Sequence, residues 1–506
     1  MNVAYTHDRM YKDIENRRQL FIDDDVIWAV HNIARRQHTP KKHPANPLIE
    51  RDKPWEVVPY FRTPTFNVIR DPEDGLFKCW YEDYYDYFGW DHSKEMQSNR
   101  IYYARSTDGL NWEKPPLGKF TIDGYNTNAV FSYPPYEMAS CSSVLLDPKE
   151  TDPSRRFKSV YYHRAWNVNV PKRNPAGRHR EGLCMAFSPD GIDWTPWEGN
   201  PLFPIWLGDV EILTYDSIDD KYVLYGRYGA RPGGPVMPSK PEGVWSTRRR
   251  IYRTETRDLF NWPEPQLWFD PDSRDNLDDH LYGFVPWRTD EMHLGLLNVF
   301  HLVSNTLDMY LHHSRDGRSW NRMLEHRPFV PRGGDGSYDQ FGVETPNQPF
   351  EVGDEVWFYY GGMSVHHDWW IWGVSEGIDA PETRDPTIAQ NGHHLCLATL
   401  RRDGYVSLEA SLREGWIETK PVFSPGAHLL INGRCDPGGY IDVEIMDGQG
   451  NVLEEYSREN VERFTGDSVK HQVQWSGRTT VNEIPGFVKL KFHLREAELY
   501  GFQFDG

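Results

Sequence analysis

The sequence predicts an all-β protein, a five-bladed β-propeller followed by a C-terminal β-sandwich. The motif Ser-x-Asp-Gly-x-x-Trp occurs at residues 106–112, 188–194 and 314–320, with a weaker copy at 256–262. Repeated β-rich units of this length are typical of propellers and solenoids. The chain is also 14% aromatic, and Gly and Pro are frequent between its short strand-like runs. This composition is typical of all-β domains with many turns.

The repeated motif has a local physical explanation. Ser and Asp side chains bond to nearby backbone N–H groups in turns. Gly permits a positive φ where the chain reverses, and the Trp can pack back on the unit as an apolar plug. We therefore expect the motif residues to build turns and not to catalyse a reaction.

Each unit begins with a predicted hairpin, which consists of two strand-like runs around a turn. In the first unit, the runs 66–70 and 76–81 flank an Asp-Pro-Glu-Asp-Gly turn. The other pairs of runs are 142–146 with 156–162, 210–215 with 221–226, 281–285 with 294–298, and 342–346 with 356–361. Five units of about four short strands each fit a five-bladed propeller.

The ends of the chain lack the motif. Residues 1–50 are expected to pack on the propeller, with part of them pairing with the last blade or covering an edge, since an open edge invites aggregation. Residues 51–408 are the predicted propeller and catalytic domain. Residues 409–506 contain runs that alternate polar and apolar residues, as half-buried antiparallel strands do. These runs predict the sandwich.

Composition excludes several classes of function. The formal net charge is −19 and no long basic run occurs, so neither nucleic acid nor an acidic membrane is an expected partner. The five cysteines are widely spaced without a Cys-x-x-Cys motif, so we expect no disulfide framework, metal or other cofactor. No apolar stretch of membrane-spanning length and no signal-like N-terminus occur, which predicts a cytoplasmic chain. Self-association is left open.

Acidic residues at or before the first strand of each unit are the candidate catalysts. In a propeller these strands surround a central funnel, where paired carboxylates can protonate a leaving oxygen and activate water or attack the sugar. The second unit offers Glu137, at the start of its first strand. The catalytic candidates that we select are Asp209, Glu211, Asp279, Asp339 and Glu344. Which residue is the acid and which the base stays open, and each is alternatively a solvated loop carboxylate.

A second set of residues has side chains suited to binding a sugar. Aromatic rings stack on apolar sugar faces, and His and Arg supply hydrogen bonds. The candidates are Trp55, Glu56, Arg62, His280, Tyr282, His366, His367 and Trp369. The adjacent His366 and His367 would point to opposite faces of a strand, which argues against a shared metal. Arg62, Arg227 and Arg332 could bind a carboxylate or sulfate on the sugar.

The unit of strand, Asp-Gly turn, strand and Ser-x-Asp-Gly-x-x-Trp resembles the five-bladed propeller glycoside hydrolases of families 32, 43, 68 and 117, and the related family 130. Residues 46–49 with Trp55 and Glu56 are similar to the entry of such propellers. Segments around 314–362 and 400–432 are similar to an uncharacterised bacterial branch. The resemblance implies a glycoside-cleaving enzyme with inward-facing carboxylates and a C-terminal sandwich.

Two departures from the families affect the site. The sequence has no Asn-Asp-Pro-Asn-Gly segment, so the usual first-blade nucleophile has no counterpart here. The segment Glu344-Thr-Pro is similar to the Glu-Gly-Pro of family 43, in which the Glu is the acid, but it lies in the fifth unit and not in the third.

The function predicted from these features is hydrolysis of a glycosidic bond in a plant or algal oligo- or polysaccharide with a furanosyl or modified sugar. We expect short substrates and removal of terminal units. One alternative is a phosphorylase of the family 130 type, which would need a basic phosphate pocket. The other is a non-catalytic carbohydrate-binding propeller.

Overall fold

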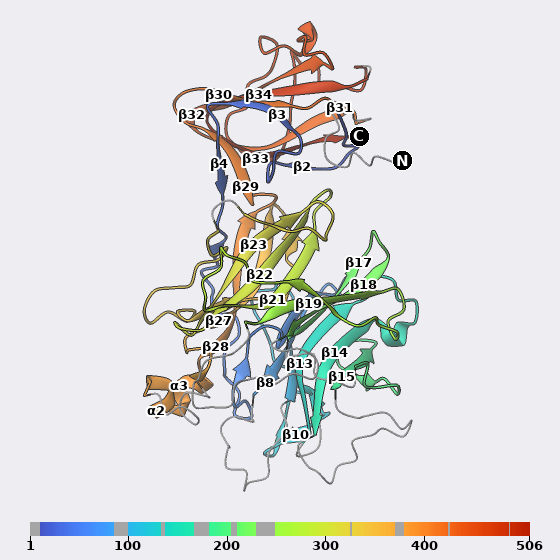
Figure 1. Ribbon diagram of the computed structural model, residues 1–506, viewed down its shortest axis with the longest axis vertical. Coiled ribbons are helices and arrows are strands. Elements are labelled where there is room, and N and C mark those ends of the chain that lie inside the picture. The colour runs from blue at the N-terminus through green and yellow to red at the C-terminus, as the bar shows by residue number, and fades with distance from the viewer. Residues whose placement is uncertain are drawn as a thin grey trace.

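The structure of the protein is a computed structural model that describes residues 11–84, 100–132, 137–165, 182–203, 210–228, 248–323, 326–369, 379–423, 426–484 and 486–506. The all-β prediction is confirmed, because strands make up nearly all of the regular structure. Figure 1 shows a C-terminal sheet at one end of the molecule, apart from a larger group of sheets formed by the preceding residues.

Antiparallel sheets of about four strands follow one another along the chain. The first contains β6 (Pro59–Tyr60), β7 (Phe66–Arg70), β8 (Phe77–Asp83), β9 (Arg100–Ser106) and β12 (Ala129–Ser132), beside a small hairpin of β10 (Thr121–Ile122) and β11 (Tyr125–Asn126). The second contains β13 (Glu137–Leu146), β14 (Phe157–Ala165), β15 (Gly182–Ser188) and β16 (Thr195–Pro196). The third contains β17 (Glu211–Asp216), β18 (Lys221–Tyr228), β19 (Arg250–Thr256) and β20 (Gln266–Phe269).

The next two groups of strands are joined into one nine-stranded sheet by a parallel pairing of Leu307 with Gly342. One group is β21 (Asp279–Arg288), β22 (His293–His301), β23 (Thr306–Ser314) and β24 (Asn321–Arg322). The other is β25 (Gly342–Glu344), β26 (Phe350–Val352), β27 (Glu355–Met363), β28 (His393–Arg401) and β5 (Lys41–Lys42). The predicted hairpins of all five units therefore form.

The first strands of these groups meet in the interior. β7 lies beside β13, β13 beside β17, and β17 beside β21. Asn298 of β22 donates from Nδ2 to the carbonyl of Thr345 at 2.9 Å, and Asn347 Oδ1 accepts from Val68 N at 2.7 Å. These contacts connect the last group to its neighbours on both sides, so residues far apart in sequence converge at one centre.

The repeated motif forms the turn after the third strand of a group, as predicted. Ser188 Oγ accepts from Gly191 N at 2.8 Å, and Asp190 Oδ1 accepts from Ile192 N at 2.8 Å. Trp194 returns a hydrogen bond to the Gly191 carbonyl at 2.9 Å. The copies at 106–112 and 314–320 make the same Ser and Asp contacts. The motif is therefore structural at each of these turns.

The N-terminal segment is divided between two sheets. Lys41–Lys42 pairs with β28 and covers its edge, as expected for part of this segment. The earlier strands instead join the C-terminal sheet, whereas we expected the segment to pack on the propeller. These are β1 (Lys12–Asp13), β2 (Gln19–Leu20), β3 (Ile27–His31) and β4 (Ala34–Gln37).

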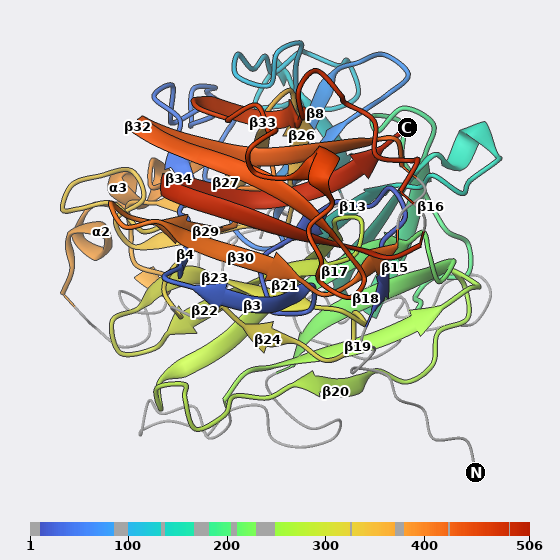
Figure 2. The ribbon, with the colours of Figure 1, turned by 90° about the horizontal axis from the view of Figure 1, so that it is seen from above.

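The C-terminal sheet is organised by two long strands, β32 (His428–Asp447) and β34 (Val488–Asp505), which run side by side in Figure 2. Their pairing continues across a register shift between Cys435 and Tyr440. The other strands are β29 (Val406–Ala410), β30 (Gly415–Thr419), β31 (Val422–Phe423) and β33 (Asp467–Gln472). One apolar core takes residues from both halves of the long strands.

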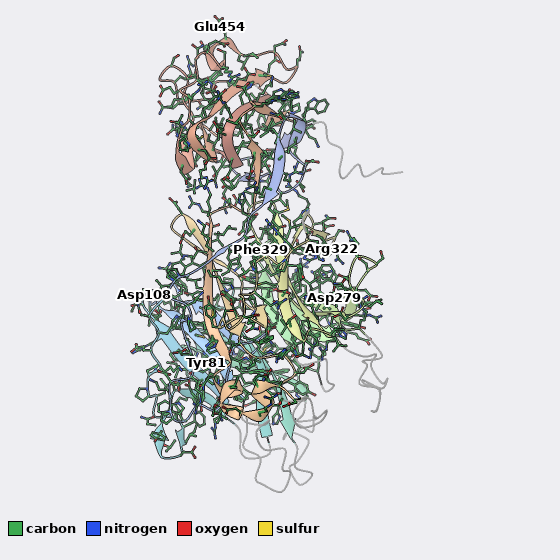
Figure 3. The ribbon with its side chains drawn as sticks, turned by 90° about the vertical axis from the view of Figure 1, so that its left-hand side faces the viewer. Tyr81, Asp108, Asp279, Arg322, Phe329 and Glu454 are labelled. Atoms are coloured by element: carbon green, nitrogen blue, oxygen red, sulfur yellow. The ribbon has the colours of Figure 1, made fainter. Side chains whose placement is uncertain are left out.

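The helices within the described residues are few and short. They are α2 (Pro381–Arg384), α3 (Pro386–Gln390) and the 3-10 turns η2 (Pro153–Arg155) and η4 (Glu454–Tyr456). Figure 3 shows Glu454 at the end of the molecule far from Tyr81. Within the described ranges, no helix has the length and apolar character needed to cross a bilayer.

Substitution of the motif glycine tests its structural role. Gly191 has φ +81°, and an added Cβ would lie 2.3 Å from Trp80 Cζ2. Gly75, in the hairpin turn of the first sheet, has φ +74° with nothing within 4 Å of such a Cβ. We expect Gly75→Ala to cost about 1 kcal/mol from φ strain alone, and Gly191→Ala to cost about 1–3 kcal/mol more from overpacking. Urea unfolding midpoints measure both; equal losses would contradict the packing argument.

Candidate active site

A buried polar cluster lies where the first strands meet. It is centred on Tyr282 and is called the Tyr282 cluster; its members are Tyr60, Arg62, Arg227, Arg249, His280, Tyr282, Phe300, Asn305, Glu344, His367 and Asp368. Arg62 is 3% exposed and connects the first sheet to both groups of strands in the nine-stranded sheet. It donates from Nη2 to the Tyr282 hydroxyl at 3.1 Å, from Nε to Glu344 Oε1 at 3.2 Å, and from Nη1 to the Tyr60 hydroxyl.

Two glycines allow the Arg62 segment to approach this centre. A Cβ on Gly361 of β27 would lie 2.1 Å from the Phe61 carbonyl oxygen, and one on Gly283 of β21 would lie 2.8 Å from Thr63 Cγ2. A side chain at either position would push the segment away from the neighbouring strands. Thr65 fixes the turn itself, since its N–H donates to the Arg62 carbonyl at 2.6 Å.

His367 connects Tyr282 to Asp368. The imidazole lies 2.9 Å from the Tyr282 hydroxyl through Nε2 and 2.5 Å from Asp368 Oδ1 through Nδ1. Asn305 holds Asp368 from two directions, because its Nδ2 donates to Oδ2 at 3.0 Å and its Oδ1 accepts from the Asp368 N–H at 2.7 Å. The result is a continuous chain of hydrogen bonds from Asn305 to Arg62.

Burial sets the protonation states in this chain. It lowers the pKa of His367 to about 3, with a further contribution from the Arg62 charge, so the imidazole is neutral. Neutral His367 donates from Nδ1 to Asp368 and accepts from the Tyr282 hydroxyl at Nε2. Burial alone would raise the pKa of Asp368, but His367 and Arg249 hold it below its ordinary value, so this carboxylate is ionised.

Three guanidinium groups surround the Tyr282 ring. The Cζ atom of Arg227 lies 4.2 Å from the ring centroid, that of Arg249 lies 5.5 Å away, and that of Arg62 lies 5.8 Å away. Burial and the nearby Arg62 lower the pKa of Arg249. Burial, followed by Arg249 and Arg227, also lowers the pKa of His280 to about 4, so this histidine is neutral.

Glu344 is the fully buried acid of the cluster. Its side chain is 0% exposed, and burial raises the pKa of its carboxyl although Arg62 opposes the shift. A carboxyl that keeps its proton to higher pH than usual can act as a general acid near neutrality. Among the residues proposed from the sequence, the structure gathers six in this cluster: Arg62, Arg227, His280, Tyr282, Glu344 and His367.

Two other catalytic candidates belong to the predicted third unit. Asp209 falls outside the described residues. Glu211, at the start of β17, is fully buried. Its neighbour Val210 packs with Tyr282, so Glu211 points to the opposite side of the strand. Glu137 is described only in its backbone, at the start of β13.

Asp279 and Asp339 make contacts away from Glu344. Asp279 Oδ1 lies 2.7 Å from His301 Nδ1, and the other imidazole nitrogen lies 3.2 Å from Asp308. Asp339 pairs with Lys42 of β5 at 2.5 Å and accepts from the Tyr360 hydroxyl at 3.0 Å. The structure therefore does not bring these two carboxylates into the Tyr282 cluster.

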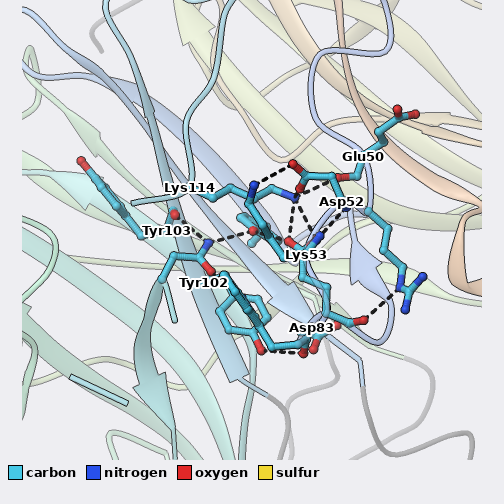
Figure 4. A network of polar contacts seen from close by, with 12 residues as sticks. Glu50, Asp52, Lys53, Asp83, Tyr102, Tyr103 and Lys114 are labelled. Carbon is cyan, nitrogen blue, oxygen red and sulfur yellow. Dashed lines mark hydrogen bonds and ion pairs between the residues drawn. The ribbon is translucent and has the colours of Figure 1, made fainter. Parts of the chain in front are cut away.

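Glu56 and Trp55 are engaged in a separate network of the first sheet (Figure 4). The Glu56 carboxylate accepts from Lys114 at 2.7 and 2.9 Å and from the Tyr81 hydroxyl at 2.7 Å. The Trp55 indole donates to Asn128 Oδ1 at 2.9 Å. The carboxylate of Glu56 and the indole of Trp55 bind other side chains of the first sheet and do not reach the Tyr282 cluster. This placement differs from the expected role of both residues in substrate binding.

His366 and Trp369 also depart from the expected role. His366 Nδ1 lies 2.5 Å from Glu382 of α2, and its ring lies 3.9 Å from that of Phe341. Trp369 is 5% exposed and packs in a small apolar core. A ring buried among apolar side chains presents no face to a sugar.

Several cluster residues were not selected from the sequence. Arg249 lies in the only noticeable basic run, and Asp368 directly follows His367. The sequence around Arg249 and Asp368 therefore gave some indication that these residues belong to a site. Tyr60 and Asn305 do not belong to any sequence motif, and only the tertiary structure brings them into the cluster. Arg332, suggested as an anion ligand, instead bonds to Asp308 at 3.0 Å.

Comparisons with known proteins give a resemblance at the level of structure alone. No protein-family model and no curated protein matches the sequence. One similar solved structure is a thermostable family-43 glycoside hydrolase, with 11% identity over 71% of this chain and 95% of that chain, at a TM-score of 0.42. Another is β-1,2-mannobiose phosphorylase from Listeria innocua, with 13% identity over 73% and 97%, at a TM-score of 0.42.

A third similar structure is the Bombyx mori family GH32 β-fructofuranosidase BmSUC1, with 12% identity over 93% of this chain and 94% of that chain, at a TM-score of 0.39. The resemblance to families 43 and 32 given above is thus found again among solved structures. At these scores it carries no argument about activity, which rests on the site.

The Asp279–His301–Asp308 contacts predict a pH dependence of stability. Burial lowers the pKa of His301, but its hydrogen bonds to the two carboxylates raise it to about 9 from an ordinary 6.5. The stabilisation is therefore complete below pH 6.5 and is lost as the pH rises through 9. Between pH 6.5 and pH 9, we expect the melting temperature of the wild type to fall more than that of His301→Gln.

His326→Gln is the matched control for this prediction. His326 is a neighbouring histidine that stacks on Tyr310, and burial lowers its pKa. Its titration therefore falls below pH 6.5, and its removal leaves the decline toward pH 9 in place. Parallel melting curves for wild type and His301→Gln across this range would refute the assignment.

Proposed function

We propose that this protein is a glycoside hydrolase whose active site is the Tyr282 cluster, with Glu344 as the general acid. The observation that carries the proposal is the complete burial of Glu344 beside Arg62, with a raised carboxyl pKa. In this proposal Glu344 gives its proton to the glycosidic oxygen as the bond to the sugar breaks. The resulting carboxylate is then stabilised by the Arg62 guanidinium, which already donates to Oε1.

The remaining members of the cluster act on Arg62 and the sugar. The Asp368–His367–Tyr282 chain fixes the tyrosine hydroxyl that accepts from Arg62. Such a chain keeps the guanidinium in position through proton transfer. We assign the second carboxylate of the reaction, which activates water or attacks the sugar, to Asp209, directly before Val210 at the start of the third unit.

We further propose that the sheets of residues 51–408 are the five blades of a propeller and that residues 409–506 form a sandwich. Support for the blades comes from successive antiparallel sheets whose first strands meet at one centre. Support for the sandwich comes from the single apolar core that β32 and β34 share. Strands β1–β4 belong with the sandwich in this assignment, because they pair with its strands.

The proposed substrate is a furanosyl or modified sugar at the end of a plant or algal oligosaccharide. We propose a bacterial, cytoplasmic protein, which would receive such sugars as short fragments. Self-association would not alter the site, because all of its residues come from one chain. The runner-up is phosphorolysis, favoured by the three guanidiniums beside Tyr282, since inorganic phosphate needs a basic pocket. Turnover that requires phosphate would establish it. A non-catalytic sugar-binding role would follow from binding without cleavage.

Activity of Glu344→Gln tests the proposal. On a panel of aryl glycosides and oligosaccharides, we expect this variant to lower kcat/KM about 10²- to 10⁴-fold for substrates with poor leaving groups. The loss should be smaller for aryl glycosides with good leaving groups, because their departure needs little protonation. The raised carboxyl pKa should place the alkaline limit of wild-type activity above that of an ordinary Glu.

Asp339→Asn and Asp279→Asn are the controls, because both are buried carboxyls of neighbouring strands that do not reach the Tyr282 cluster. They should lower the melting temperature and leave kcat within a few-fold of wild type. Full activity of Glu344→Gln on a confirmed substrate would refute the assignment of the acid.

A further inference from the structure

A groove of about 440 Å³ lies between the third sheet and the group of β21–β24. Its walls come from the end of β17, the first half of β18, the end of β21 and the start of β22, together with the motif turn at 314–320. The Tyr282 cluster takes Arg227 and Tyr282 from nearer the other ends of β18 and β21. The groove is therefore a separate feature, and its volume lies in the range of about 300–1,000 Å³ that is typical of small-molecule sites.

The groove lies where the repeated structure changes. At two copies of the motif, an aromatic side chain of the neighbouring group bonds to the turn. Trp80 Nε1 donates to the Gly191 carbonyl at 2.6 Å, and the Tyr359 hydroxyl donates to the Gly109 carbonyl at 2.8 Å. The space between the first and second sheets that Trp80 lines is only about 10 Å³. Within the described ranges, no residue of the third sheet bonds to Gly317 in this way, so this turn leaves room for a ligand.

The motif tryptophan of this turn also differs from the others. In the other copies, the indoles of Trp112, Trp194 and Trp262 donate to the carbonyl three residues earlier, at 3.1, 2.9 and 2.7 Å. Trp320 makes no such bond, and its Nε1 atom is buried and unpaired in the part of the chain that the structure describes. Its ring lines the groove and lies 4.8 Å from that of Phe284 in a T-shaped contact. Local departures of this kind from a repeated pattern are typical of functional positions.

Several charged residues of the groove are already paired. Lys221 and Arg253 contact the Glu255 carboxylate at 3.2 and 2.5 Å. Arg315 contacts Asp23 of the N-terminal segment at 2.7 Å. These ion pairs hold the walls of the groove together, so a ligand must be recognised mainly by other side chains.

Two guanidiniums and two carboxylates are left among the described lining residues. Arg288 pairs with no carboxylate there, and Arg318 lies 3.7 Å from the carboxylate of Glu255. Asp216 and Asp316 accept hydrogen bonds from N–H groups of their own turns and pair with no cation in the described chain. Because both signs of charge are equally represented, this lining favours a neutral ligand that carries both donors and acceptors.

Aromatic rings lie beside these polar groups. Tyr215 and Trp320 line the groove and are partly exposed. Sugar rings have apolar C–H faces that pack on aromatic side chains, and their hydroxyls can donate to carboxylates and accept from guanidiniums.

We propose that this groove is a second carbohydrate-binding site, which takes a neutral oligosaccharide apart from the catalytic centre. The inference goes beyond the proposed function, because none of the described lining residues belongs to the Tyr282 cluster and the ligand class follows from the groove's own side chains.

The test is a titration that reports on the groove alone. Protein labelled with 5-fluorotryptophan is titrated with cellotetraose, xylotetraose, mannotetraose and arabinotetraose, and ¹⁹F NMR spectra are recorded. The Trp320 resonance is assigned by its loss in Trp320→Phe. We expect at least one tetrasaccharide to shift this resonance saturably. The Trp112 resonance, assigned with Trp112→Phe, should stay in place, because Trp112 does not line the groove and is bonded to Gly109.

Matched double variants locate the binding. Arg288→Gln with Arg318→Gln should weaken it about tenfold or more, since hydrogen bonds to charged groups are lost. Arg250→Gln with Arg274→Gln should leave it unchanged, because these arginines do not line the groove. Arg274 is 68% exposed and Arg318 66%, so neither substitution removes a buried contact. If Trp320→Phe fails to fold, a resonance that the sugar shifts in wild type but not in the Arg288 and Arg318 variant still identifies the groove.

The outcomes separate this inference from the proposed function. No saturable shift of the Trp320 resonance with any tetrasaccharide, or a shift that survives in the Arg288 and Arg318 variant, overturns the second site. A shift caused by inorganic phosphate at lower concentration than by every sugar also overturns it. Hydrolysis that depends on Glu344 would remain intact in each case. Sugar binding in the groove without cleavage of any glycoside would support the second site and remove the hydrolase.

Discussion

The guanidinium of Arg62 is the group on which the centre of this protein depends. It is buried, and it joins the Tyr60 side chain of the first sheet to the Tyr282 and Glu344 side chains of the nine-stranded sheet. A buried cation is tolerated only when its donors are used and a counter-ion is close. Removal of one partner of such a pair typically costs about 3–5 kcal/mol. The contacts of the Arg62 guanidinium therefore influence both how these sheets meet and how readily the Glu344 carboxyl ionises.

Burial shifts the pKa values of the ionisable groups at the centre in different directions and so gives these groups different roles. It raises the pKa of Glu344 and lowers the pKa values of His280 and His367. Neutral histidines can accept and donate one hydrogen bond each, which suits them to hold a tyrosine or a carboxylate in place. Glu344 is the carboxyl of the cluster whose pKa burial raises, and the arginines carry the positive charge.

Sequence patterns predicted the all-β class, the hairpins of the five units and the structural nature of the repeated turns, because these depend on local periodicity and turn chemistry. They also selected six cluster residues, among them Arg62 and Glu344. The contacts of Asp279 and Asp339 could not be foreseen, since His301 and Lys42 reach them only in the folded chain. The burial of Trp369 could not be foreseen either, because a tryptophan in the core and one that faces a sugar look alike in sequence.

The pairing of the earliest strands with the latest ones has a consequence for biosynthesis. β1–β4 bond to strands between Val406 and Asp505, and β5 bonds to β28. On the ribosome, the N-terminal strands therefore emerge long before their partners exist, and the sheet edges they cover stay open until the strands between residues 393 and 505 have been synthesised. Such edges are points of aggregation. Chaperone dependence during synthesis thus follows from the topology, whatever the final stability of the folded chain.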